Sequence, residues 1–223
     1  MKVLTRSGEY KTEDSEDKYA FLSQIGEPVH SRGLIVKRGL DFVFGVIFLM
    51  LSVPVLIVFG ILVKLTSKGP VFYKQRRVGL CGKTFNIIKL RSMKQDAEKV
   101  TGAVWAQKND PRVTKIGRFM RRTRIDELPQ FWNVVVGDMS LVGPRPERPG
   151  FTEEFTKKIP FFPQRLRIKP GITGYAQVHG GYDITPEKKA KLDNIYIKHF
   201  SLMTDVKVIV DTIHVVFTGE GSR

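Results

Sequence analysis

Two adjacent carboxylates, Asp126 and Glu127, stand in the stretch RIDELPQFW at residues 124–132. An Asp followed by a Glu is an ordinary helix start, worth about 1 kcal/mol to the helix, and by itself it indicates no chemistry. Several cations precede the pair, namely Arg118, Arg121, Arg122 and Arg124. A helix N-terminus and nearby arginines both lower the pKa of a carboxyl group. We therefore expect Asp126, near the N-cap of a new helix, to be ionised and able to attack an electrophile or hold a metal ion.

A further arginine follows in the stretch VGPRPER, residues 142–148. Pro144 and Pro146 restrict the backbone on either side of Arg145, which favours a fixed guanidinium for bidentate contact with a phosphate. A diphosphate held beside an ionised Asp126, with Mg²⁺ on Glu127, has the parts for phosphoryl transfer through an aspartyl-phosphate. A glycosidase is disfavoured, because its two carboxylates stand about 5 Å or more apart across a sugar ring.

The bulk composition favours an anionic partner. The 223 residues are enough for one domain with a core, and 37 Lys and Arg against 22 Asp and Glu give a net charge of +15. Residues 1–31 differ, with four Lys or Arg and six Asp or Glu, and we expect residues 1–32 to form a flexible polar tail. The single cysteine, Cys81, excludes an internal disulfide, and no His or Cys spacing indicates a zinc site.

A long apolar run is the strongest single signal in the chain. Phe42 to Val63 are 22 residues without a charge, the length of a membrane helix. Pro54 lies inside the run and predicts a kink, and cations flank both ends, so the positive-inside rule assigns no orientation. A helix that re-enters the leaflet it came from puts both cationic flanks near anionic headgroups, and we favour this over a spanning helix with a tolerated proline.

The remaining segments predict a helix-rich α+β domain. Residues 70–93 read as a small β-hairpin, and residues 110–124 as a basic amphipathic helix. Gly137 can end the helix that follows Asp126, and Thr185 begins another, before a last apolar helix over 206–217. The amphipathic helices pack on a core or lie in the membrane interface. Nucleic-acid binding is disfavoured, because no helix-turn-helix, zinc or RNA-binding signature accompanies the cations.

From Lys37 onward the chain resembles the catalytic domain of the monotopic bacterial phosphoglycosyl transferases, also called bacterial sugar transferases. The resemblance rests on several motifs in order: KRGLD at 37–41, PVFYKQRRVG and FNIIKLRSM in the hairpin, IDELPQFWNVVVGDMSLVGPRPE at 125–147, and KPGITGYAQV at 169–178. It covers about 185 residues. The chain is similar to the small, single-domain members of that family.

The resemblance implies an activity and a role for each matching residue. Asp126 would attack the sugar-linked phosphorus of a UDP-sugar and expel UMP, Glu127 would bind Mg²⁺, and a polyprenol phosphate would then take the phosphosugar. The residues that the resemblance assigns to substrate phosphate are Arg145, Arg121, Lys89 and Arg91. Those that it assigns to the membrane anchor and its helix break are Lys37, Arg38, Asp41, Ser52 and Pro54.

The same resemblance implies a place in the cell and a division of the chain. Residues 33–68 would form a re-entrant helix-break-helix in the bacterial cytoplasmic membrane, among membrane lipids, and residues 69–223 a catalytic domain on its cytoplasmic face. The oligomeric state stays open, a homo-oligomer included, as does the sugar, whose selecting region includes VHGGYD at 178–183. The competing hypothesis is a non-catalytic membrane adaptor that binds anionic lipids through its basic surface.

Overall fold

The computed structural model describes residues 3–4, 10–11, 19–95, 97, 110–180 and 184–218. Its helices are α1 (Arg32–Thr66), α2 (Lys115–Arg122), α3 (Gln130–Val136), α4 (Pro149–Lys158), α5 (Tyr175–His179), α6 (Pro186–Lys198) and α7 (Leu202–Thr218). Its strands are β1 (Val3–Leu4), β2 (Tyr10–Lys11), β3 (Phe72–Val78), β4 (Thr84–Leu90), β5 (Ser140–Val142) and β6 (Gly171–Thr173). Tight helical turns are η1 (Ala20–Gln24), η2 (Leu80–Gly82), η3 (Ile125–Glu127) and η4 (Phe162–Arg167). The predicted helix-rich α+β fold is confirmed at this level.

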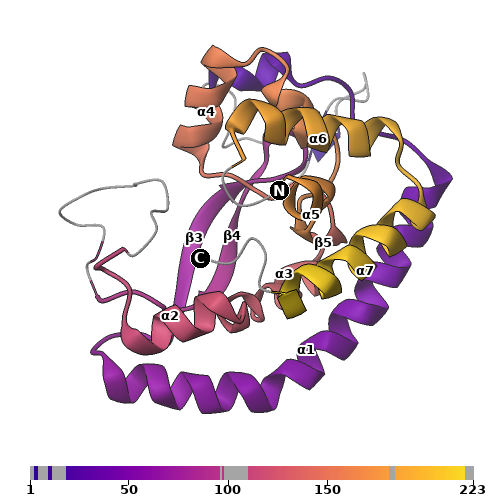
Figure 1. The fold of residues 1–223 in the computed structure, drawn as a ribbon. Helices are drawn as coiled ribbons and strands as arrows, with labels where there is room; N and C mark the ends of the chain where they lie inside the picture. The colour runs from indigo at the N-terminus through magenta and orange to yellow at the C-terminus, as the bar shows by residue number, and fades with distance from the viewer. Residues whose placement is uncertain are drawn as a thin grey trace.

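The predicted hairpin is formed by β3 and β4, which pair antiparallel along their whole length. Side chains alternate along a strand, so Phe85, Ile87 and Lys89 lie on one face of β4. Phe85 and Ile87 are buried in a cluster that includes Val134 of α3. Lys89 continues this face, and Figure 1 shows the hairpin rising from α1 past α3. The hairpin therefore places one lysine of its inner face at the end of the core.

Helix α1 is continuous over 35 residues and is bent rather than broken (Figure 1). Pro54 cannot donate a backbone hydrogen bond, and the hydroxyl of Ser52 donates to the carbonyl of Phe48 at 2.6 Å. Both a proline and such a back-bonded serine bend helices without ending them. The structure thus has a bend within a continuous helix, as the proline itself predicts, where the resemblance implied a break.

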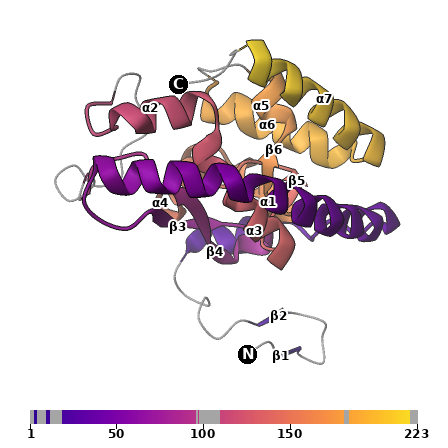
Figure 2. The same cartoon turned by 90° about the horizontal axis from the view of Figure 1, so that it is seen from below.

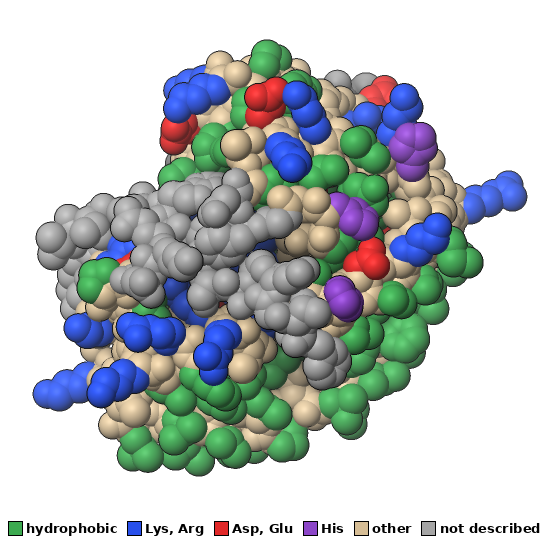
Figure 3. Space-filling model, in the orientation of Figure 1, with side chains coloured by type: hydrophobic (Ala, Val, Ile, Leu, Met, Phe, Trp, Pro, Cys, Tyr) green, Lys and Arg blue, Asp and Glu red, His purple; other side chains and the backbone are tan. Residues whose placement is uncertain are grey.

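One face of α1 lies against the domain, and the rest of its surface is apolar and exposed. The residues buried on its inner face are Lys37, Asp41, Gly45, Ser52, Gly60 and Val63. The helix passes across one side of the molecule, with α2 and α3 next to it in both views (Figures 1 and 2). Hydrophobic side chains line this edge in Figure 3. Helix α7 also exposes apolar side chains, including Met203, Val206 and Val210, as a helix in a membrane interface would.

The core joins the small parallel pair of β5 and β6 to the last two helices. Val142 of β5 packs with Tyr196 of α6 and Val208 of α7. Gly143, which follows β5, approaches the backbone of the β6 segment so closely that a Cβ atom there would lie 2.4 Å from the carbonyl oxygen of Lys169. Glycine is required at this position, and the contact fixes where the stretch after β5 leaves the core.

The flexible polar tail predicted over residues 1–32 is wrong from Tyr19 onward. Most of residues 1–18 lie outside the described part of the chain, but from Tyr19 the chain packs on the domain. Phe21 of η1 is 1% exposed and contacts Val78 and Leu166. Residues 19–29 hold their apolar side chains at irregular spacing, so no periodic signal in the sequence revealed this contact.

Candidate active site

The two carboxylates lie on a tight turn between two helices. Arg124 takes up a left-handed conformation with φ of 61°, which reverses the chain after α2 and begins η3. Asp126 and Glu127 both lie on η3 and both are buried. The expectation that Asp126 is near an N-cap is wrong, because α3 begins only at Gln130. A left-handed arginine costs about 1–2 kcal/mol, so the turn is held by its surroundings rather than by local preference.

Glu127 is held by two cations. Lys89 on β4 donates to its Oε1 at 2.7 Å, and Arg145 donates to its Oε2 at 3.2 Å and also to Oε1. Burial alone would raise the pKa of Glu127, but Arg145 and Lys89 more than offset burial and hold that pKa well below its usual range. Glu127 is therefore ionised at every pH at which the protein would be studied.

Asp126 has a different environment from its neighbour. Its side chain is 6% exposed, and within the described residues its carboxylate accepts no hydrogen bond. Burial raises its pKa to about 6; the charge of Lys89 opposes this rise and the charge of Glu127 adds to it. The lowered pKa predicted from the arginines is thus wrong, because burial outweighs them. Near neutral pH Asp126 is a buried, ionised carboxylate that no described residue hydrogen-bonds, and such a carboxylate is a good nucleophile.

Arg145 reaches this pair from the stretch between β5 and α4. Its two terminal nitrogens contact the two oxygens of Glu127, so it makes a bidentate pair. The contact with Glu127 raises the pKa of Arg145, despite burial. One cluster therefore contains Arg145, Lys89, Glu127 and Asp126. They come from the stretch after β5, the end of β4 and the turn η3.

Arg121 and Arg91 have separate positions. Arg121 of α2 donates from Nε to the hydroxyl of Ser92 at 2.9 Å, and its charge is one of those that lower the pKa of Asp126. Arg91 instead holds the end of α1, because its guanidinium donates to the carbonyl of Ser67 at 2.8 Å and to that of Lys68. The structure brings Arg121 toward the carboxylates and directs Arg91 to the membrane helix.

Sequence reasoning assigned no role to the buried charges under this cluster. Arg77 on β3 donates to the carbonyl of Pro146 at 3.1 Å and lies 3.6 Å from Glu147. Glu147 is buried, as is Arg165 of η4. Glu147 was quoted only as part of a motif. Charge and spacing in the sequence do not distinguish a solvated cation from one that is enclosed by the fold.

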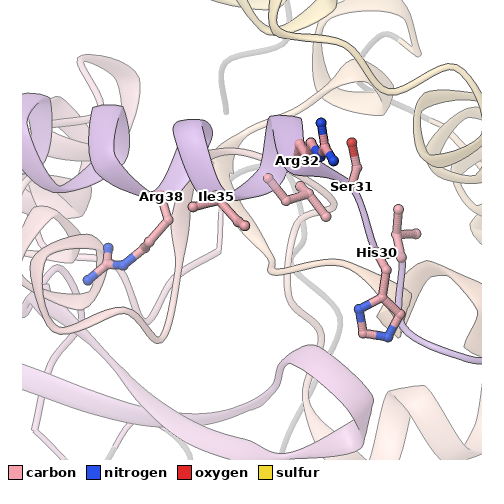
Figure 4. Close-up of a pocket in the computed structure, with 7 residues that line it drawn as sticks. His30, Ser31, Arg32, Ile35 and Arg38 are labelled. Carbon is pink, nitrogen blue, oxygen red and sulfur yellow. The ribbon is translucent and has the colours of Figure 1, made fainter.

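The expected anchor residues on α1 contact the domain. Lys37 lies 2.6 Å from Asp205 of α7, and Asp41 accepts from the hydroxyl of Ser140 at 2.8 Å. Arg38 donates to the carbonyls of Val134 and Val135, which end α3. The start of α1 also lines a surface hollow with His30, Ser31, Arg32, Ile35 and Arg38 (Figure 4). The guanidinium of Arg38 is already engaged by α3, so these residues mainly join α1 to the domain.

The donor set of the cluster fits Mg²⁺ in kind. Mg²⁺ prefers oxygen ligands and usually takes one or two carboxylates together with substrate phosphates and water. Asp126 supplies a carboxylate with no hydrogen bond from the described residues, and Glu127 supplies a second. Both oxygens of Glu127 already accept from cations, so a metal there needs the phosphates of a substrate to draw Arg145 or Lys89 away. In the described part of the chain no group of three or more His, Cys, Asp and Glu side chains gathers as a metal site.

Comparison with known proteins places the chain in a family. Residues 32–219 match the bacterial sugar transferase family. The chain belongs to this family. It is 44% identical to the UDP-N-acetylgalactosamine-undecaprenyl-phosphate N-acetylgalactosaminephosphotransferase of Aeromonas hydrophila over 204 residues. These aligned residues are 90% of this chain and 47% of that protein.

Two further relatives differ in length. The UDP-glucose:undecaprenyl-phosphate glucose-1-phosphate transferase of Escherichia coli is 42% identical over 192 residues, 83% of this chain and 41% of that protein. The exopolysaccharide production protein PSS of Rhizobium leguminosarum bv. phaseoli is 39% identical over 188 residues, 81% of this chain and 94% of that protein. This bacterial sugar transferase chain thus spans about half the length of the first two relatives and nearly all of the third.

Proposed function

We propose that this protein transfers a hexose 1-phosphate from a UDP-sugar to undecaprenyl phosphate and releases UMP, as a step that begins a surface polysaccharide or glycoconjugate. The observation that carries the proposal is the buried Asp126, free of hydrogen bonds from the described residues, one residue from a Glu127 that two cations hold. The names of the aligned relatives support the substrate class, and they differ in the sugar.

The reaction proceeds in two displacements at one phosphorus. A carboxylate oxygen of Asp126 attacks the phosphorus that bears the sugar, forms an aspartyl ester with it, and breaks its bond to the oxygen that leaves on UMP. A phosphate oxygen of undecaprenyl phosphate then attacks the same phosphorus, forms the lipid diphosphate sugar and returns the carboxylate of Asp126. Burial of the Asp126 carboxylate favours the attack, because a desolvated carboxylate is a stronger nucleophile.

The cations act on the phosphates rather than on the nucleophile. Arg145 is bidentate in the protein alone and is geometrically suited to a diphosphate. Lys89 and Arg121 add charge on other sides of Asp126, which stabilises the charge that develops on the leaving UMP. Glu127 would hold Mg²⁺ together with the diphosphate, and the ion would offset further phosphate charge. Arg91 has its guanidinium engaged at the end of α1, so we propose no direct phosphate contact for it in this arrangement.

We further propose that α1 is a re-entrant anchor in the cytoplasmic membrane with the domain on the cytoplasmic face. Its outward surface is apolar, its buried face is polar or small, and its bend brings both of its ends toward the domain (Figure 1). By length and composition α1 is also the one described helix that could cross a membrane. The bend and the placement of Lys37 and Arg91 at its two ends support re-entrance over crossing.

The experiment is a UMP-release screen of the purified protein with Mg²⁺, undecaprenyl phosphate and a panel of UDP-sugars that includes UDP-glucose and UDP-N-acetylgalactosamine. Omitting the lipid acceptor should leave a phosphosugar adduct on Asp126, visible by peptide mass spectrometry. The Asp126→Asn variant should lose both adduct and turnover, by at least about a thousandfold. Protein that binds anionic vesicles but releases no UMP from any donor would favour the adaptor hypothesis.

A further inference from the structure

Beneath the stretch that carries Arg145 lies a buried ionic network that the proposed reaction does not use. Arg165 of η4 is 2% exposed and Asp193 of α6 is 1% exposed, and neither was singled out by sequence. Arg165 donates to Oδ2 of Asp193 from Nε at 2.9 Å and from Nη2 at 2.6 Å. Its guanidinium also lies 5.0 Å from the ring centre of Phe162. Arg165 is therefore fixed in position by its own surroundings.

The same guanidinium contacts the backbone of the proposed phosphate-binding arginine. Nη2 of Arg165 donates to the carbonyl oxygen of Arg145 at 2.8 Å. The next two residues are held as well, since Arg77 donates to the carbonyl of Pro146 and Glu147 pairs with Lys189. A small cavity of about 10 Å³ lies between this stretch and η4, lined by Arg145 and Arg165 among others. It has room for about one water molecule.

Stability alone is a weak reason for such a network. Removing two charges from water costs several kcal/mol per ion, and apolar replacements of a buried ion pair are often neutral or stabilising. What an apolar side chain at residue 165 could not do is donate to a carbonyl. The flanking prolines limit the backbone at Arg145, and the hydrogen bond from Arg165 selects one orientation of its peptide group. The guanidinium of Arg145 is then directed at Glu127.

We infer that Arg165, oriented by Asp193, is a positioning residue for Arg145, and that this pair sets the affinity of the site for the diphosphate of the sugar donor. The inference deepens the proposed function and rests on it for the identity of the ligand. The positioning of Arg145 itself depends only on the contacts above.

The test compares Arg165→Lys with Arg165→Met and with wild type. Lysine can keep one charge contact with Asp193 but has no planar fork to reach Asp193 and the carbonyl of Arg145 together. If Arg165 acted only as a buried charge, Arg165→Lys would behave as wild type. We expect instead that Arg165→Lys raises KM for the UDP-sugar about tenfold while kcat changes by less than about threefold. Arg165→Met should raise KM at least as far, if it folds.

A second readout needs no turnover. Exchange of the backbone N–H groups within residues 143–148, followed by mass spectrometry, should be faster in Arg165→Lys than in wild type. The carbonyl of Arg145 then lacks its donor, so the stretch opens more often. The matched control is Asp205→Asn, which weakens a buried ion pair of similar length that lies at α1 and α7. It should lower thermal stability without changing KM or exchange over residues 143–148.

The outcomes separate the two proposals. Unchanged KM and unchanged exchange in Arg165→Lys would overturn the inference, and so would an equal rise of KM in Asp205→Asn. Wild type that releases no UMP with any donor would overturn the proposed function, and exchange over residues 143–148 would then still decide whether Arg165 positions Arg145.

Discussion

At the scale of single residues, two neighbouring carboxylates differ because their surroundings differ. Two cations contact Glu127 and lower its pKa. Asp126 is buried and accepts no hydrogen bond from the described residues, and burial raises its pKa. The sequence singles out both residues as a candidate reactive pair, and this stays a prediction. It was not enough to predict the sign of the pKa shift at Asp126, because burial depends on how β4, η3 and the stretch after β5 pack together.

The raised pKa of Asp126 makes folding stability depend on pH. Its folded pKa is about 6 and its ordinary value is 3.8, so the folded state binds the proton more tightly. The contribution of Asp126 to the free energy of unfolding is therefore fully present below about pH 4 and is lost as the pH rises through about 6. Asp126→Asn removes the titration. We expect the variant to gain stability over wild type as the pH rises from 4 to 7, on the order of 2 kcal/mol.

Thermal unfolding in detergent and EDTA, at intervals from pH 4 to 8, measures this gain without a bound divalent cation. Glu127→Gln is the contrasting variant. The carboxylate of Glu127 has a lowered pKa and two cation partners, so Glu127→Gln should destabilise the protein at neutral pH. A difference between Asp126→Asn and wild type that is constant across this range would contradict the raised pKa.

At the scale of elements, polar contacts join α1 to the strands that lead to the candidate site. Asp41 accepts from the hydroxyl of Ser140 and the backbone N–H of Leu141 on β5, and β5 leads directly to Arg145. Arg91 at the other end of α1 follows β4, which carries Lys89. The sequence shows the charged residues of the KRGLD motif and of the β3–β4 hairpin. It could not predict which of them face lipid and which face the domain, because both roles place cations beside an apolar run.

Removal of Lys37 should show how strongly α1 is joined to the domain. Lys37→Met leaves Asp205 and Asp41 without their buried cation, since Lys37 lies 2.6 Å from the first and 3.8 Å from the second. An unpaired buried carboxylate is costly, so we expect a loss of about 3–5 kcal/mol in the free energy of unfolding. Chemical denaturation in detergent measures the loss.

The double variant Lys37→Met with Asp205→Leu is the companion to this measurement. It removes one of the stranded charges together with its partner and should recover part of the lost stability. A headgroup-only role for Lys37 predicts instead that the single variant is as stable as wild type in detergent and weaker only in binding to anionic vesicles.

At the scale of the whole molecule, local signals predicted the elements better than their arrangement. The β3–β4 hairpin and the start of α6 at Thr185 follow from turn and cap residues, and both are present. Phe21 packs on Val78 and Leu166, and Arg165 pairs with Asp193, 28 positions further along the chain. Such contacts leave no periodic trace in either segment.

The topology of α1 can be tested with cysteines whose positions the structure selects. Gly33 and Gly69 flank the helix, but Gly69 has φ of 113° and a Cβ atom there would lie 2.2 Å from the guanidinium of Arg91. Arg32 and Lys68 are better positions, because both side chains are exposed and lie at the two ends of α1. The native Cys81 is exposed on the hairpin and reports the side on which the domain lies.

We therefore expect a membrane-impermeant maleimide to label three single-cysteine proteins from the same side of sealed inverted membrane vesicles: wild type at Cys81, and Arg32→Cys and Lys68→Cys in a Cys81→Ser background. None should label in intact cells or right-side-out vesicles. A crossing helix would place Arg32 and Lys68 on opposite sides, because about 20 residues span a bilayer. The bend at Pro54 allows residues 32 and 68 to lie on the same side of the membrane. Pro54→Leu in the Arg32→Cys background should therefore favour a straight, crossing helix and move some of the label to the outer face.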